Sequence, residues 1–389
     1  MSARVVILTA GFGEGHNAAA RALAVACDAR HGPKTALVAD VFALAAPRLN
    51  TLARRSYLGL INRAPGVWSA AYRWLDRSTI FPRLVGAMRA ELRTLDRLIA
   101  REQPQVLCST YPVYAFMLRE LERRGRKLPL HFNVVTDSIS INSLWWRASA
   151  AGWFLPNEDS ASVLRAAGVD AARLHTLGFP VTTFFSRNTG ALFPPDLAVG
   201  GAPRVLYIVN SGTKAAAEIA RRLLVETRWE ITCTVGRNET LRVELERLAA
   251  ARKYPTRILS WTNEIPALLM THHVVISKAG GATTQEALAA RCPMIVNQIV
   301  PGQEEGNYEL LRRHGIGALA ETPEAVLAEL NRAFADRGRL IAQWRRALEP
   351  ISRPDAARDI AAALFTQTEA PTEPIPLPLQ SGRAVPLSA

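Results

Sequence analysis

The residues best suited to chemistry lie in polar, glycine-containing segments that follow short apolar runs. The first is Gly11-Phe12-Gly13-Glu14-Gly15-His16, after the run Val5–Leu8. Glycines let the backbone approach a ligand closely, and a helix start favours negative charge. A neutral histidine there can accept a proton from a hydroxyl group. We therefore predict His16 as a catalytic base, with a solvated or capping histidine as the alternative.

A dinucleotide-binding loop is a second interpretation of the same segment. That loop needs the spacing GxGxxG and an acidic ribose partner after the next strand. The sequence GFGEGH does not fit the spacing, although Asp40 lies near the required distance. The dinucleotide interpretation therefore stays open.

The second segment is SKAGGATTQEAL, residues 277–288. Gly280 and Gly281 form a turn before a helix expected near Thr283, where amide groups, hydroxyls and the helix dipole favour a diphosphate. Glu286, about one turn further, could accept ribose hydroxyls. Thr283 and Glu286 also match a helix-capping pair, which is the structural alternative. The third segment, PGQEEGN, residues 301–307, suits hydrogen bonds to sugar hydroxyls.

Alternating strands and helices must position these segments. Apolar runs predict strands at 4–9, 35–41, 106–109, 130–136 and 152–155, and again at 204–209, 230–235, 257–260, 274–277 and 294–297. Such alternation indicates an α/β protein with a parallel sheet in each half. Ligands of such sheets bind beyond the carboxyl ends of the strands, so we expect the active site in a cleft between the halves.

Composition divides the chain into domains. We predict an N-terminal domain over residues 1–185, a glycine- and proline-rich linker over 186–203 and a second domain over 204–352. A C-terminal helix over 353–366 and a disordered, proline-rich tail over 367–389 complete the prediction. No apolar stretch is long enough for a membrane span, and the N-terminus lacks the features of a secretory signal. We therefore expect a cytoplasmic protein.

The four cysteines, Cys27, Cys108, Cys233 and Cys292, form no CxxC pair, so we expect neither a disulfide framework nor a metal site. The charge is more informative. The net charge is +13, and residues 1–200 hold 24 basic and 14 acidic residues, a net of +10. Only five residues of the chain are lysine, so a genomic bias toward arginine codons is one explanation.

A basic region within residues 48–97 offers a functional explanation. It contains ten arginines against Asp76, Glu91 and Asp96, and it is interleaved with aromatic residues. Arginine mixed with Trp and Tyr is typical of an anionic membrane interface. A solvated helical face over an aromatic core is the alternative. We expect no nucleic acid partner, because sugar and diphosphate segments would have no role there.

The three segments, in this order and at these separations, resemble the family of monogalactosyldiacylglycerol synthases and processive diacylglycerol glucosyltransferases. These are GT-B enzymes related to MurG, and the resemblance covers roughly residues 4–350. Further similar segments are VTD at 135–137 with Trp145, LGFPV at 177–181, GRN at 236–238 and SWT at 260–262. The resemblance implies a GT-B fold of two Rossmann-like parallel-sheet domains.

The resemblance also implies roles for individual residues. His16 would be the catalytic histidine, and Asp137 would orient a group, bind the acceptor or itself be the base. Donor-site positions implied by the family or suggested by their loops are Ser211, Gly212, Thr213, Arg237, Trp261, Thr262, Gly280, Gly281, Thr283, Glu286, Gln303, Glu304 and Asn307. The expected acceptor-binding positions are Gly13, Gly15, Asn142 and Trp145, with a buried core tryptophan as the alternative for Trp145.

Two positions depart from the family. Asn142 stands where a histidine usually precedes the tryptophan, so this position cannot accept a proton. Val209-Asn210-Ser211-Gly212-Thr213 replaces the usual glycine-rich turn that opens the second domain. Both departures bear on which donor and acceptor the protein uses.

The prediction is an inverting, metal-free UDP-sugar-dependent hexosyltransferase that needs no cofactor beyond its UDP-sugar co-substrate. Its acceptor would be diacylglycerol or a glycosylated form of it. The basic region would hold the protein peripherally on the inner face of the cytoplasmic membrane. Three alternatives remain: a UDP-sugar transferase with another acceptor, a UDP-sugar epimerase, and a non-catalytic membrane-associated protein of the same fold.

Overall fold

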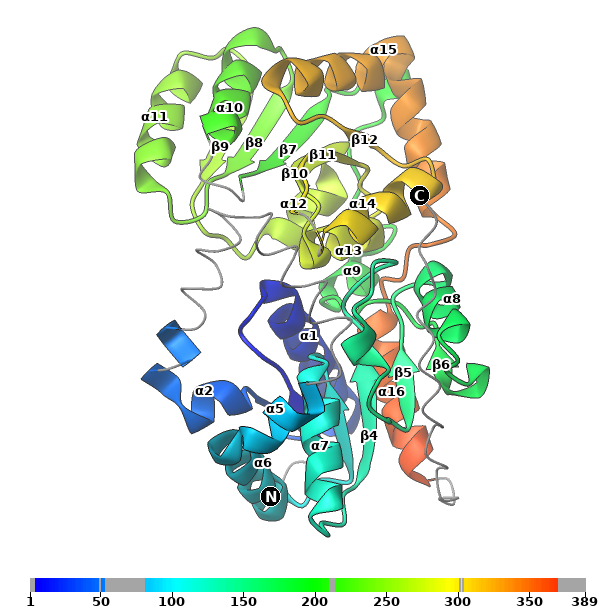
Figure 1. The fold of residues 1–389 in the computed structure, drawn as a ribbon. Helices are drawn as coiled ribbons and strands as arrows, with labels where there is room; N and C mark the ends of the chain where they lie inside the picture. The colour runs from blue at the N-terminus through cyan, green and yellow to red at the C-terminus, as the bar shows by residue number, and fades with distance from the viewer. Residues whose placement is uncertain are drawn as a thin grey trace. The chain divides into compact units, whose positions relative to one another are not determined.

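Two compact units, each built on one six-stranded sheet, make up the protein. The computed structural model describes residues 4–48, 50–52, 81–209, 214–300, 302 and 304–369. Unit 1 combines residues 1–180 with 356–389, and unit 2 comprises residues 181–355. All strand pairs among the described residues are parallel, and helices connect the strands (Figure 1). The predicted parallel α/β sheet in each half is therefore confirmed.

Unit 1 has the strand order β2-β1-β3-β4-β5-β6. Its strands are β1 (Val5–Leu8), β2 (Ala36–Ala39), β3 (Val106–Ser109), β4 (Leu130–Val134), β5 (Gly152–Phe154) and β6 (Leu174–His175). Its helices are α1 (Glu14–His31), α2 (Val41–Ala45), α5 (Phe81–Ala87), α6 (Arg89–Glu102), α7 (Val113–Arg123), α8 (Glu158–Ala166) and α16 (Ala356–Glu369), with short 3-10 helices η1 (Ser143–Trp145) and η2 (Ala171–Arg173).

Both faces of the unit 1 sheet are covered, which explains why its strands are continuously apolar. Successive side chains of a strand point to opposite faces. Val5 and Ile7 accordingly join the core formed with α1 and α16, whereas Val6 and Leu8 join the core formed with α6 and α7. This double cover fixes the carboxyl ends of the strands, where the polar segments begin.

Unit 2 has the strand order β12-β11-β10-β7-β8-β9. Its strands are β7 (Arg204–Ile208), β8 (Glu230–Thr234), β9 (Thr256–Leu259), β10 (Val274–Lys278), β11 (Met294–Gln298) and β12 (Ala318–Leu319). Its helices are α9 (Phe184–Asn188), α10 (Lys214–Glu226), α11 (Glu239–Ala250), α12 (Ile265–Thr271), α13 (Gly281–Ala289), α14 (Glu305–Arg313) and α15 (Pro323–Leu348), with the 3-10 helix η3 (Leu197–Val199).

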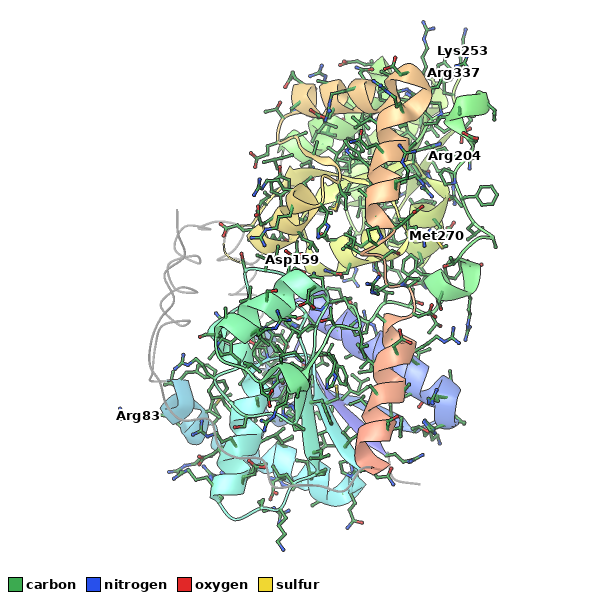
Figure 2. All side chains as sticks on the ribbon, turned by 90° about the vertical axis from the view of Figure 1, so that its right-hand side faces the viewer. Arg83, Asp159, Arg204, Lys253, Met270 and Arg337 are labelled. Atoms are coloured by element: carbon green, nitrogen blue, oxygen red, sulfur yellow. The ribbon has the colours of Figure 1, made fainter. Side chains whose placement is uncertain are left out.

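Helices α10, α11 and α15 share one core with the sheet of unit 2. Helix α15 bends at Ala335–Gly338, where the backbone leaves helical angles, and Figure 2 labels Arg337 of this turn. Gly338 has φ +74°, and a Cβ there would lie 2.3 Å from Leu197 Cδ1. Glycine is therefore required at this position both for its backbone angles and for space.

The segment predicted as a linker, residues 186–203, is packed rather than free. The structure assigns it to unit 2, whose boundary lies at residue 181. The imidazole of His273 hydrogen-bonds the Pro195 carbonyl oxygen (2.7 Å), and η3 packs against α15. Composition alone could not show these tertiary contacts, which depend on residues distant in the chain.

The C-terminal helix differs from its prediction in two ways. It extends to Glu369, beyond the predicted end at 366, and it belongs to unit 1 rather than following the second domain. Most of the predicted disordered tail, residues 370–389, lies outside the described residues. Within the described part of the chain, no helix is both long and apolar enough to cross a membrane.

Candidate functional site

The glycine loop between β1 and α1 is anchored at both ends by hydrogen bonds. The Thr9 hydroxyl donates to the Asn17 side-chain oxygen (3.0 Å), and the Tyr114 hydroxyl donates to the Thr9 carbonyl oxygen (2.7 Å). The Gly11 amide donates to the Asp40 carboxylate (3.0 Å). These contacts hold the loop at the carboxyl edge of the unit 1 sheet.

Asp40 serves the fold rather than a ribose. Its Oδ1 accepts from the Ala43 amide (3.0 Å) and so caps α2, while its Oδ2 accepts from the Gly11 amide. Both oxygens therefore bind the protein's own backbone. The dinucleotide interpretation loses the acidic partner that it requires.

His16 lies in the first turn of α1, which begins three residues before the predicted start at Asn17. Its Nδ1 lies 2.8 Å from the Thr136 hydroxyl oxygen, and the Thr110 hydroxyl donates to its carbonyl oxygen (3.0 Å). Burial lowers the pKa of His16 to about 4, although a hydrogen bond to the Thr110 backbone acts in the opposite direction. The imidazole is therefore neutral near pH 7.

Gly13 of the glycine loop adjoins the His16 ring. A Cβ on Gly13 would lie 3.4 Å from His16 Cδ2 and 3.8 Å from Nε2. The absence of a side chain at Gly13 therefore leaves space beside Nε2. Gly13 is the N-cap of α1, and Gly15 lies in its first turn. Both predicted acceptor positions thus lie in the segment that carries the histidine.

Asp137 follows β4 at the same edge of the sheet. Its Oδ2 accepts a hydrogen bond from Trp145 Nε1 (2.7 Å). Burial raises the pKa of Asp137 to about 6, and the hydrogen bond from Trp145 opposes that rise. Two residues later Ile139 has φ +54°, an unusual conformation for a β-branched side chain that costs about 1–3 kcal/mol. Such local strain is typical of functional segments.

Trp145 and Asn142 do not lie as the acceptor prediction expects. Trp145 has 0% of its surface exposed and its indole donates to Asp137, which does not fit the predicted contact with an acceptor. Asn142 is 5% exposed and caps η1 by accepting from the Leu144 amide (3.0 Å). Its Nδ2 has no hydrogen-bond partner among the described residues.

An aromatic group adjoins His16. The rings of Phe12, Phe42 and Tyr111 lie with centroids 6.0–6.2 Å apart, and Tyr111 meets the His16 ring edge-on at 5.1 Å. All three aromatic side chains are only half-buried. The surroundings of His16 therefore offer apolar surface as well as a proton acceptor.

In unit 2, α13 begins directly after β10 with Gly280 as its N-cap. No side chain caps this helix start in the part of the chain that is described. The first amide groups of a helix lack carbonyl partners within it, so they are available to an anion. A Cβ on Gly280 would meet only ordinary contacts, 3.6 Å from Glu304 Oε1 and Lys278 Cε. The protein's own packing therefore does not require glycine at this position.

Thr283 and Glu286 lie on the partly exposed face of α13. The capping pair considered from the sequence is wrong, because the helix begins at Gly281 and Thr283 lies inside its first turn. Thr284, the next residue, is fully buried and lies on the side of α13 that packs into the unit. Thr283 therefore lies close to the helix start, and Glu286 lies further along the same helix.

Glu304 and Asn307 connect the neighbouring loops. Glu304 is 6% exposed; its Oε1 pairs with Lys278 and its Oε2 accepts from the Val300 amide (2.9 Å). Asn307 donates through Nδ2 to the Ala279 carbonyl oxygen (2.9 Å), and its buried Oδ1 has no partner among described residues. These residues fix the loop before α13.

Arg237 and Trp261 project from the same edge of the unit 2 sheet. Arg237 is exposed after β8, and Trp261 is 65% exposed after β9. Thr262 accepts from the Glu264 amide (3.1 Å) at the start of α12. A large exposed indole at a strand end offers a stacking surface to a ligand.

Several predicted residues lie outside the described part of the chain: Ser211, Gly212, Thr213 and Gln303. The same holds for half of the arginines of the basic region and for Tyr57, Trp68, Tyr72 and Trp74. The remaining five arginines, at 48, 83, 89, 93 and 97, are exposed. Phe81 instead packs edge-on against Phe116 (centroids 5.0 Å).

Sequence reasoning missed three residues that shape these sites. Thr136, Tyr111 and Lys278 each follow or end a predicted strand, so their place at the carboxyl edge was foreseeable. Their contacts were not foreseeable, because the partners, His16 for Thr136 and Tyr111 and Glu304 for Lys278, come from distant parts of the chain.

Comparisons with known proteins support the resemblance. The family model for monogalactosyldiacylglycerol (MGDG) synthase matches residues 16–181. A processive diacylglycerol beta-glucosyltransferase of Bacillus cytotoxicus is 24% identical over 381 residues, which are 96% of each chain. A protein of the same name from Bacillus cereus is 24% identical and covers 97% of each chain.

Two solved structures share the fold at low identity. Os79 from O. sativa in complex with UDP has a TM-score of 0.63 at 12% identity, covering 94% of this chain and 100% of that chain. UDP-GlcNAc 2-epimerase from Neisseria meningitidis bound to UDP-GlcNAc has a TM-score of 0.56 at 11% identity, covering 93% and 99%. The resemblance inferred from the motifs and the GT-B fold are confirmed, and the relatives are named for the predicted class of enzyme.

Proposed function

We propose that this chain, which resembles processive diacylglycerol glucosyltransferases along its whole length, is an inverting GT-B glycosyltransferase. It moves a hexose from a UDP-sugar to a hydroxyl group of diacylglycerol or a glycosylated diacylglycerol. The observation that carries the proposal is the neutral, oriented His16 beside the ionisable Asp137 at one strand edge. The whole-length relatives support the lipid acceptor.

Unit 1 supplies the proton acceptor. With the ring proton on Nδ1, donated to the Thr136 hydroxyl, the lone pair of His16 Nε2 remains for the acceptor hydroxyl. The space left by Gly13 lies next to that nitrogen. The half-buried rings of Phe12, Phe42 and Tyr111 favour an acceptor with an apolar body.

Asp137 supplies a negative charge near the same segment. With a pKa of about 6, it is mostly ionised at pH 7. Its carboxylate favours positive charge on His16 as the proton arrives, and it can instead take the proton itself. A group with a pKa near the working pH is the better matched general base. In either role Asp137 must be ionised, so the rate should fall as the pH drops through about 6.

Unit 2 supplies the donor site. The start of α13 binds the diphosphate through its amide groups and Thr283, and Glu286 binds the ribose. Strand β9 is three positions from β10 in the sheet, or about 14 Å at the usual strand spacing of ~4.8 Å. This separation supports a role for Trp261, after β9, in stacking on the base of a nucleotide whose phosphates lie at α13.

Bond cleavage leaves growing negative charge on the departing UDP. Amide donors and the positive end of the α13 dipole are oriented before the reaction, so they stabilise that charge with little reorganisation. The acceptor oxygen attacks the anomeric carbon from the opposite side, which inverts its configuration.

The exposed arginines at 48, 83, 89, 93 and 97 attach the protein to an anionic membrane surface. Each basic residue near such a surface contributes about 1 kcal/mol. We accordingly place the protein at the inner face of the cytoplasmic membrane, where its lipid acceptor resides.

The test is incubation with a panel of UDP-sugars and total membrane lipid, with product masses recorded. We expect a lipid heavier by one or more hexose units and an equivalent release of UDP. Transfer to soluble acceptors alone would contradict the lipid acceptor. Conversion of a UDP-sugar without any acceptor would indicate an epimerase, and liposome binding without UDP release would indicate a non-catalytic protein.

A further inference from the structure

The indole of Trp145 is the hydrogen-bond partner that the structure gives to Asp137 within its described residues. The Nε1–Oδ2 distance is 2.7 Å. Trp145 belongs to η1, eight residues beyond Asp137, and its side chain has no exposed surface. An indole N–H can only donate, so it stabilises the ionised carboxylate rather than the neutral acid.

Two side chains of the sheet hold the backbone of Trp145. Its carbonyl oxygen accepts from Trp153 Nε1 (2.6 Å) and from Asn133 Nδ2 (3.4 Å). Trp153 lies on β5 and Asn133 on β4, and both are buried. The sheet therefore holds Trp145 by its carbonyl group while the indole reaches Asp137.

The hydrogen-bond chain continues into the sheet. The Ser109 hydroxyl donates to Asn133 Oδ1 (2.8 Å) and lies 2.8 Å from His131 Nε2. Because the single hydroxyl proton of Ser109 is used, His131 must donate through Nε2. Its Nδ1 then carries a lone pair that has no partner among the described residues. Burial lowers the pKa of His131 to about 3, so this ring is neutral.

Asp137 is thus the charged end of a chain of neutral groups. His16 is a titratable group beside this pair: its ring centroid lies 6.5 Å from that of Trp145, and its Nδ1 contacts Thr136, the residue before Asp137. Tyr111 lies behind His16. His16 is neutral near pH 7, so it does not offset the charge of Asp137.

We propose that Trp145 is a positioning residue: held through its carbonyl oxygen by Trp153 and Asn133, it orients Asp137 and keeps that carboxylate ionised for the transfer reaction. This inference rests on the proposed function for its catalytic readout. Packing in the core would require only the aromatic ring of Trp145, whereas this role requires its N–H group.

The decisive variant is Trp145→Phe, which keeps an aromatic ring in the core but removes the N–H donor. The pKa of Asp137 should rise by about one unit, because the interaction that favours its charged form is lost. The acidic limb of the pH profile of kcat should move to higher pH by the same amount. We expect turnover at pH 7 to fall roughly 10-fold, with about twofold restored at pH 8.5, while the KM for the UDP-sugar stays unchanged.

The matched control is Trp229→Phe. Trp229 lies in unit 2 and packs on Phe334 (centroids 5.0 Å), so the same substitution there should leave the pH profile unchanged. A second variant, Trp153→Phe, removes a donor to the Trp145 carbonyl oxygen and should shift the limb in the same direction by less. It keeps the inference testable if Trp145→Phe does not fold.

A readout independent of activity completes the test. The Asp137 carboxyl carbon, labelled with carbon-13 and assigned by its loss in Asp137→Asn, reports the pKa directly by NMR titration. An upward shift in Trp145→Phe supports the inference. An unchanged Asp137 pKa in a folded Trp145→Phe protein overturns it, even if turnover falls. Absence of transfer activity in the wild type would instead contradict the proposed function, and the titration would still decide this inference.

Discussion

The imidazole Nδ1 of His16 and the hydroxyl oxygen of Thr136 lie 2.8 Å apart, joining the first turn of α1 to the end of β4. This contact fixes both the ring orientation and the nitrogen that remains available. Two segments separated by 120 residues in the sequence thereby form one proton-accepting group.

His16→Ala should reduce turnover by about 10²–10⁴-fold, since general base catalysis typically contributes that much. UDP affinity should change little, because the diphosphate is assigned to α13 in unit 2. Steady-state kinetics and calorimetric titration with UDP measure the two quantities. Unchanged turnover would refute the role of His16.

Thr136→Val should lower turnover, whereas Thr136→Ser should largely preserve it. Valine keeps the shape of threonine but cannot accept the Nδ1 proton, so the ring loses its fixed tautomer; serine keeps the hydroxyl. We expect a loss of about 10-fold for valine, from roughly 1–1.5 kcal/mol of hydrogen-bond energy. Equal activity of the two variants would show that this contact does not set the tautomer.

The pH dependence of kcat/KM should show an acidic limb near pH 6. Burial raises the pKa of Asp137 to about 6, so its carboxylate is lost as the pH falls through that value. His16, with a pKa of about 4, would produce a limb two units lower if it acted without Asp137. Asp137→Asn should remove the limb near pH 6, and a wild-type limb near 4 would show that the charge of Asp137 is dispensable.

Asp137→Asn should also stabilise the fold at neutral pH. The pKa of this carboxyl group is about 6 in the folded protein against a usual 3.8, so the folded state binds the proton more tightly than the unfolded state. The carboxyl group therefore destabilises the fold increasingly as the pH rises from about 4 through 6, by about 1–3 kcal/mol. Thermal unfolding should show a higher Tm for the variant at pH 7.5 and little difference at pH 3.5. A lower Tm at pH 7.5 would contradict this reasoning.

Trp261→Ala should weaken binding of UDP without affecting thermal stability. The indole is 65% exposed, so it contributes little to the core of unit 2. Stacking of a base on an aromatic side chain is worth about 1–3 kcal/mol, or roughly 5–150-fold in Kd. Val243→Ala, a partly exposed position on α11, is a suitable control. UDP affinity equal to that of the wild type would remove Trp261 from the donor site.

Local patterns in the sequence predicted the strand at 4–9, the glycine turn and helix that follow it, and the turn at Gly280 and Gly281, because these depend on residues close together in the chain. They placed His16, Asp137 and Gly280 correctly at strand ends. They could not reveal that Trp145 holds Asp137 or that Lys278 pairs with Glu304, since those contacts depend on tertiary packing. Trp145 was accordingly assigned to the acceptor rather than to the support of Asp137.

Helix α16 has a consequence for how the protein is made. Its residues Ile360 and Leu364 cover the same face of the unit 1 sheet as α1, yet the ribosome reaches them only after the whole of unit 2, residues 181–355. At 5–20 residues per second, that delay is roughly 9–35 s. During this interval the apolar residues that pack on α16 in the finished unit lack that partner, so the nascent N-terminal half is incompletely covered.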